Sequence, residues 1–103
     1  MVVTPYQKGR LREYKALNIL RKEGWVCSRS AMSHGPIDIF AAKDGHVLLI
    51  QVKSGKGRLS KQEADDILRW SKAFDAVGEV WFFKNRGSLV KRKIFPLPER
   101  PSV

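Results

Sequence analysis

The sequence predicts an α/β protein (an α+β mixed sheet), with two helices flanking five strands in the order α-β-β-β-α-β-β. Two segments carry apolar residues at helical spacing, and five short runs are rich in β-branched and aromatic residues. Turn-forming residues separate these segments. Hydrophobic residues make up 43% of the 103 residues, which is enough for one packed core but leaves little room for a second. We expect one domain over 1–103, with its core at about 7–95 and a proline-rich tail at 96–103.

The first element is a helix predicted over residues 7–23, because Gly24 is a natural C-terminal stop. A strand at 25–30 follows it. The next six residues, 31–36, are predicted to form a loop, since they include both a glycine and a proline.

A hairpin comes next, with strands at 37–42 and 47–53. The turn between them contains an Asp-Gly pair, which favours a tight antiparallel connection. The second strand opens with four apolar residues in succession, as is typical of a strand in the middle of a sheet. Counting residues across the turn places Asp38 near Gln51.

The C-terminal half begins with a basic, glycine-rich loop at 54–59, followed by a helix that runs to about residue 74. Ser60 and Glu63 form an S-x-x-E capping box at the start of this helix. One face of the helix should pack on the sheet, with the residues Ala64, Ile67, Leu68, Ser71 and Phe74. The last two strands are predicted at 79–84 and 89–95.

The net charge of the chain indicates the class of partner that it binds. The chain has 20 Lys+Arg against 10 Asp+Glu and a formal net charge of +10, which is typical of proteins that bind phosphates, above all nucleic acids. No apolar run reaches the roughly 18 residues that a membrane span needs, and the N-terminus lacks the apolar region of a signal peptide. The single cysteine, Cys27, can form neither an internal disulfide nor a cysteine-based zinc site. We expect a soluble, cytoplasmic protein with no membrane contact.

One acidic residue lies where the first helix should be apolar. Glu13 stands on a helical stripe with Ala16, Leu17 and Leu20. Burying a lone carboxylate costs several kcal/mol unless the group is paired or binds a metal. Two interpretations therefore remain open, namely a salt bridge to a nearby arginine such as Arg10 or Arg12, and a metal ligand.

A second polar cluster is predicted on the hairpin. Asp38 interrupts a β-rich run, where aspartate is disfavoured. Gln51 and Lys53 are two residues apart, so their side chains project from one face of the neighbouring strand. Each of these residues could be an ordinary solvated strand residue. Together with Glu13 they offer the oxygen ligands that a hard divalent cation prefers, and a lysine that can stabilise an oxyanion. This combination predicts hydrolysis of a phosphodiester.

The ordered motifs resemble those of the PD-(D/E)xK nuclease superfamily. They are Glu13 on the first helix, Gly35-Pro36-Ile37-Asp38, and Gln51-Val52-Lys53. The sequence is most similar to the archaeal-type Holliday junction resolvases, small basic proteins that also occur in viruses. The similarity extends over about 8–83 and includes the segments at 29–35, 53–56 and 61–63.

The resemblance implies a restriction-endonuclease-like core and a role for each motif residue. Asp38 is implied as the metal-binding acid, Glu13 as the helix-borne acid that completes the site, and Lys53 as the catalytic lysine. Ser33 matches a serine that lies near the scissile phosphate in the resolvases. The implied cofactor is Mg²⁺, for which Mn²⁺ can substitute, with no small-molecule cofactor. The implied assembly is a two-fold symmetric homodimer on four-way DNA.

Gln51 departs from the family pattern, in which Glu or Asp is usual. Its amide oxygen can still ligate a metal, so we include Gln51 among the catalytic residues, but the site has one negative charge less. We expect weaker metal binding, or one ion in place of two. The glutamine is compatible with a natural residue and with a deliberate replacement of glutamate.

Basic and polar side chains around the motif are predicted to bind DNA phosphates. They are Lys8, Arg10, Arg12, Arg29, Ser30, His34, Lys56 and Arg58. The three tryptophans, Trp25, Trp70 and Trp81, are assigned to the core or to dimer contacts. The apolar run at 80–83 is expected to bury part of its surface against a second subunit.

Three functions remain open. The first is a Mg²⁺-dependent, structure-selective endonuclease, namely a Holliday junction resolvase. The second is a non-catalytic DNA-binding module whose site has degenerated through Gln51. The third is a flap or duplex nuclease of the same superfamily, although so short a chain leaves little room for a separate sequence-reading domain.

Overall fold

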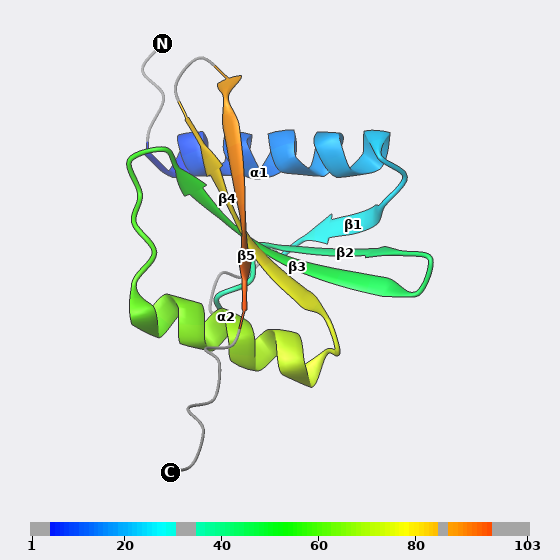
Figure 1. The fold of residues 1–103 in the computed structure, drawn as a ribbon. Coiled ribbons are helices and arrows are strands. Elements are labelled where there is room, and N and C mark those ends of the chain that lie inside the picture. Colours follow the sequence, from blue (N-terminus) through cyan, green and yellow to red (C-terminus); the bar gives the residue numbers. More distant parts are fainter. Residues whose placement is uncertain (1–4, 31–34, 85–86, 96–103) are drawn as a thin grey trace.

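Figure 1 shows the computed structural model of the chain, which describes residues 5–30, 35–84 and 87–95. The elements in chain order are α1 (Pro5–Lys22), β1 (Val26–Arg29), β2 (Ile39–Lys43), β3 (His46–Ser54), α2 (Lys61–Ala73), β4 (Val77–Phe83) and β5 (Leu89–Ile94). This is the predicted order, and each element begins and ends within two residues of its expected bounds. Ser33, His34 and the tail at 96–103 lie outside the described residues. No helix in the described ranges is long and apolar enough to cross a membrane.

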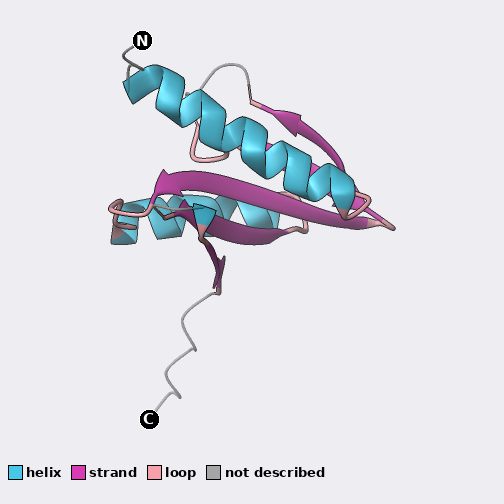
Figure 2. Ribbon diagram, turned by 90° about the horizontal axis from the view of Figure 1, so that it is seen from above, coloured by secondary structure: helices cyan, strands magenta, loops and turns pink. Residues whose placement is uncertain are grey.

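The five strands form one mixed sheet in the order β1-β2-β3-β4-β5. β3 and β4 run parallel, and the other three neighbouring pairs are antiparallel. A parallel pair needs a crossover connection, which α2 supplies. The sheet lies between the two helices (Figure 2), so both of its faces are covered.

Each helix closes a separate apolar core against the sheet. The core under α1 includes Leu20, Ile39 and Ile50. The core under α2 includes Leu49 and Ile67. Because β2 and β3 contribute alternate residues to the two cores, these strands are apolar on both faces at their centres.

The apolar run of β4 is also divided between the cores. Val80 and Phe82 pack in the α2 core, whereas Trp81 and Phe83 pack in the α1 core. Burial within one subunit therefore accounts for the apolar character of this run, and the predicted contact with a second subunit is not needed to explain it. The run is apolar on both faces because a helix covers each face of the sheet.

The β2–β3 hairpin has the tight turn that the sequence predicts. Lys43 pairs with His46 across two residues, Asp44 and Gly45. These two residues have φ values of 51° and 80°, in the left-handed region that a type I′ turn requires. The resulting register pairs Ile39 with Ile50, so that Asp38 comes opposite Gln51 as the residue count predicts.

The helix α2 packs closely on β4. Ile67 and Ser71 are buried, and a Cβ on Gly78 of β4 would lie only 2.5 Å from Ser71 Oγ. Glycine at this position therefore permits the close approach of helix and strand. Phe74 departs from the predicted buried stripe: it caps the helix, stacks on Trp70 and is 47% exposed.

Candidate functional site

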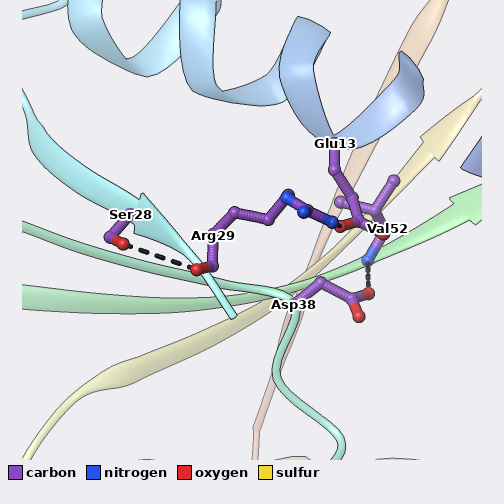
Figure 3. A network of polar contacts seen from close by, with 5 residues as sticks. All are labelled: Glu13, Ser28, Arg29, Asp38 and Val52. Carbon is purple, nitrogen blue, oxygen red and sulfur yellow. Dashed lines mark hydrogen bonds and ion pairs between the residues drawn. The ribbon is translucent and has the colours of Figure 1, made fainter. Parts of the chain in front are cut away.

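Asp38 lies at the bend immediately before β2, not within the strand as predicted. Its backbone is nonetheless paired on both sides, since its N–H donates to Ile50 and its carbonyl accepts from Ser30, each at 2.8 Å. Its Oδ2 accepts the Val52 N–H at 2.7 Å (Figure 3). The carboxylate thus takes the place of a backbone carbonyl where the β2–β3 ladder ends, and it is held beside the backbone of β3.

Gln51 and Lys53 lie on the α2 side of β3. Their neighbours Ile50 and Val52 pack in the α1 core, and successive side chains of a strand point to opposite faces. This alternation confirms the prediction that the polar pair shares one face and the apolar pair the other. Lys53 is close enough for its positive charge to lower the pKa of Asp38.

Glu13 reaches the site from α1, on the other side of the sheet (Figure 3). Its Oε1 accepts a hydrogen bond from Arg29 Nη1 at 3.1 Å. A salt bridge to an arginine is therefore present, but the partner comes from β1 and not from the same helix. Glu13 also lies close enough to Asp38 for the two negative charges to interact. Both interpretations of Glu13, as an ion-paired residue and as a metal ligand, remain compatible with this geometry.

The pKa of Asp38 is raised from 3.8 to about 6. Burial is the main cause, and the negative charge of Glu13 acts in the same direction, whereas the Val52 N–H and the Lys53 ammonium lower the pKa. A carboxylate in such surroundings gains from a proton or a cation beside it.

We expect binding of a divalent cation to weaken below about pH 6, because the proton on Asp38 competes with the cation. The affinity for Ca²⁺ or Mg²⁺, measured by titration calorimetry, should fall about tenfold per pH unit below the pKa and level off above pH 7. The same shift affects folding: the folded chain holds this proton more tightly, so the free energy of unfolding decreases as the pH rises from about 4 to 6. An affinity that is constant between pH 5 and 8 would contradict Asp38 as a ligand. Asp38→Asn is the control and should show no such pH dependence.

The amide of Gln51 shows that the residues present fit a metal ion. Its Oε1 is buried and has no hydrogen-bond partner among the described residues. A buried acceptor without a donor costs about 1–3 kcal/mol, and a cation at this oxygen would remove that cost. Two carboxylates and an amide oxygen are suitable ligands for a hard cation. No cluster of three His, Cys, Asp or Glu side chains occurs within the described ranges, and an amide would supply the third ligand here.

A basic cleft of about 890 Å³ lies beside the C-terminal end of β3. Its cationic lining comes from α1, from the loop after β3 and from the residue that follows β4, and consists of Lys8, Arg12, Lys15, Lys56 and Lys84. The cleft brings together three predicted DNA-binding residues, Lys8, Arg12 and Lys56. The other two, Lys15 and Lys84, were not among the predicted DNA-binding residues. Helical spacing from Leu11 and Arg12 could have indicated Lys15, whereas Lys84 enters the cleft only because Ser54 pairs with Phe83 across the parallel strands.

Other predicted DNA-binding residues lie outside this cleft. Arg29 pairs with Glu13, and its guanidinium lies 5.4 Å from the centre of the Tyr14 ring. Arg10 is exposed and hydrogen-bonds to Tyr14, which together with the charge of Arg29 lowers the pKa of that phenol. Arg58 is exposed in the loop before α2. Ser30 lies beside the site, since its N–H donates to Asp38.

Comparisons with known proteins point to a single family. The family described as "Archaeal holliday junction resolvase (hjc)" matches residues 4–96 of the chain. A crossover junction endodeoxyribonuclease Hjc from Methanocaldococcus jannaschii is 32% identical over an alignment of 72 residues, and the match covers 67% of this chain and 53% of that protein. The chain thus spans about half the length of this curated relative.

A solved structure agrees with this assignment. It is that of Archaeoglobus fulgidus Hjc, a Holliday junction resolvase from an archaeal hyperthermophile, which matches with a TM-score of 0.74 and 28% identity. The match covers 84% of this chain and 73% of that one. The chain therefore belongs to the archaeal Holliday junction resolvase (Hjc) family.

Proposed function

We propose that the protein is a metal-dependent, structure-selective DNA endonuclease that cuts four-way junctions. The observation that carries this proposal is the buried, unpartnered oxygen of Gln51, on the strand residue opposite an Asp38 whose pKa is raised to about 6. A cation would give the Gln51 oxygen a partner and would favour the ionised form of Asp38, and neither residue does this for the other. Family membership supports a four-way junction as the substrate, since the two relatives described above are named as junction-cutting enzymes.

Each residue of the site has a part in the proposed hydrolysis. Glu13, Asp38 and Gln51 would hold the cation through two carboxylates and one amide oxygen. Mg²⁺ or Mn²⁺ bound there supplies Lewis-acid polarisation of the phosphate and activation of water. Lys53 holds a positive charge beside the position where negative charge develops on the phosphate oxygens. Ser33, which lies outside the described residues, keeps its proposed place near the scissile phosphate.

Arg29 is proposed to link cation binding to DNA binding. In the absence of a cation its guanidinium neutralises Glu13 at 3.1 Å. A divalent cation competes for the same carboxylate, and a guanidinium released from it can bind a phosphate in bidentate fashion. Cation binding and DNA binding would therefore support each other through this one residue.

The DNA backbone is proposed to follow the basic cleft. Its five cations lie on three separate segments of the chain, next to the strand that ends with Lys53 and Ser54. Gly55 in its lining allows the loop after β3 to lie close to the Lys84 backbone, because a Cβ on Gly55 would lie 2.7 Å from Lys84 Cα. The proposed contacts are Lys8, Arg10, Arg12, Lys15, Arg29, Ser30, His34, Lys56, Arg58 and Lys84.

Lys15→Ala and Lys84→Ala should each weaken binding to a four-way junction. Each substitution removes one cation from the cleft, so the slope of log K against log salt should decrease by about one for each lysine that contacts a phosphate. Fluorescence anisotropy at several salt concentrations measures both quantities. Lys72→Ala is a matched control, since this exposed lysine is in the last turn of α2 and outside the cleft lining. Equal effects at positions 72 and 84 would contradict the proposed path.

We also propose that the protein acts as a homodimer, because two matched cuts across a junction require two sites related by two-fold symmetry. An apolar cleft of about 280 Å³ at the edge of the sheet offers a contact surface. Val26 of the edge strand β1 is 79% exposed there, and Phe74, which caps the C-terminus of α2, lines the same cleft. Sedimentation of the wild type and of Phe74→Glu would test this assembly.

A cleavage assay on four-way junction, flap and duplex substrates, with Mg²⁺ and with Mn²⁺, tests the proposed function. Preferential cutting of the junction supports it. Preferential cutting of flap or duplex would instead identify another nuclease of this superfamily. Junction binding without cleavage under either metal, by both the wild type and Gln51→Glu, would identify a non-catalytic binding module.

A further inference from the structure

We propose that Glu63 is a positioning residue for Lys53, which fixes the lysine ammonium to the start of α2, near Asp38 but out of direct contact with it. The kinetic consequence of this inference rests on the proposed nuclease function. Its structural part concerns the cation-free protein and stands independently of that function.

The carboxylate of Glu63 is shared between two partners. Its Oε1 accepts the Ser60 N–H at 3.2 Å, and its Oε2 lies 2.7 Å from Lys53 Nζ. Ser60 Oγ in turn accepts the Glu63 N–H at 3.1 Å. The capping box therefore holds Glu63 at its backbone N–H and at its Oε1, and leaves Oε2 directed to Lys53.

The aliphatic stem of Lys53 is held as well. The Gly57 N–H donates to the Ser54 carbonyl at 2.9 Å, and this turn lays the Gly57 backbone against the lysine. A Cβ on Gly57 would lie 3.3 Å from Lys53 Cβ and 3.5 Å from Lys53 Cδ. The side chain of Lys53 is consequently only 18% exposed, against 34% for Glu63. The loop thus covers the stem while Glu63 fixes the ammonium.

The positive charge of the Lys53 ammonium affects two carboxyl groups. It lowers the pKa of Glu63, mainly through their hydrogen bond, and it also lowers the pKa of Asp38 through its charge. Only the contact with Glu63 is a direct ion pair, since Lys53 and Asp38, both described residues, are not joined within 4.0 Å. Glu63 therefore holds the ammonium near Asp38 while leaving the Asp38 carboxylate available to a cation.

Glu63→Gln is the decisive variant, because glutamine is also a capping-box residue at this position but carries no charge. We expect the Lys53 ammonium to give a slowly exchanging NMR signal in the cation-free wild type and to lose this signal in Glu63→Gln. The single-turnover rate of junction cleavage should fall about 10–100-fold. The junction Kd, measured in Ca²⁺, should stay within about twofold, since the basic cleft does not include Glu63.

Ser60→Ala separates positioning from helix stability. It removes the Ser60 Oγ acceptor but leaves the Glu63 carboxylate and Lys53 in place, so we expect Tm to fall by about 4–8 °C with the ammonium signal and the cleavage rate retained. An unchanged Lys53 signal and rate in Glu63→Gln would overturn the proposal. So would an equal loss of rate in both variants, because that result would indicate a purely structural role. A wild type that cuts no junction would refute the proposed function, and the NMR comparison alone would then decide the role of Glu63.

Discussion

Asp38→Asn will remove nearly all cleavage of a four-way junction and leave binding of the junction almost unchanged. The asparagine oxygen can still accept the Val52 N–H, but the negative charge that attracts the cation is lost. We expect the single-turnover rate at saturating Mg²⁺ to fall on the order of 10³-fold. The Kd for the junction should stay within about twofold, because the cations of the cleft are untouched.

The same substitution should stabilise the cation-free protein. At pH 7 the folded chain carries an ionised carboxylate whose pKa is raised to about 6, so ionisation opposes folding. Removing this charge should raise the free energy of unfolding by about 1–3 kcal/mol, as measured by denaturation in urea. A substitution that removes activity and increases stability is typical of a residue that serves function although it destabilises the fold.

Asp44→Asn provides the matched control for Asp38→Asn. Asp44 is on the same hairpin but at its turn, at the opposite end from the site, and asparagine accepts its positive φ of 51°. We expect this variant to cleave and to bind as the wild type does. If Asp38→Asn retained a rate within about tenfold of the wild type, or if it lost binding and cleavage equally, Asp38 could not be the principal metal ligand.

Gln51→Glu will change stability in opposite directions with and without a cation. The new carboxylate replaces the buried amide oxygen of residue 51, which lies opposite Asp38. Without a cation it therefore adds repulsion between two negative charges in desolvated surroundings and should lower Tm. With Mg²⁺ it adds a third negative ligand and should raise Tm above that of the wild type. We expect the cation affinity, and the cleavage rate at limiting Mg²⁺, to increase at least about tenfold.

Gln62→Glu makes the same chemical change on an exposed turn of α2 and serves as the control. Calorimetric titration with Mg²⁺, and cleavage at several Mg²⁺ concentrations, should separate the two variants. A cation affinity in Gln51→Glu equal to that of the wild type would place residue 51 outside the coordination sphere. Tighter cation binding without any cleavage would favour the non-catalytic alternative.

Local patterns in the sequence predicted much of the fold. The capping box begins α2, the Asp-Gly pair forms the hairpin turn, and Gly24, with φ of 91°, follows the end of α1. Such features depend on residues close together in the chain, whose preferences the fold does not override. The fold class and the resemblance to the resolvases are confirmed by the structural and family comparisons.

Contacts between distant segments could not be predicted in the same way. The Glu13–Arg29 pair joins α1 to β1, and the cleft acquires Lys84 only because β3 and β4 are parallel. Likewise, Glu63 could be recognised as a cap but not as the partner of Lys53. Asp38 was expected within a strand, whereas its side chain takes over a backbone position at the end of the ladder. Each of these results depends on tertiary packing, which short sequence patterns do not encode.

The division of β4 between the two cores has a consequence for folding. Val80 anchors one core and Trp81 the other, so neither layer can open without disturbing the strand that both of them share. Glu13 belongs to the helix of one layer, and the partner of Lys53 to the helix of the other. A partly unfolded chain that has released either helix has therefore lost either Glu13 or the partner that positions Lys53. The proposed DNA-cutting centre is thus complete only in the cooperatively folded state, in which both helices lie on the sheet.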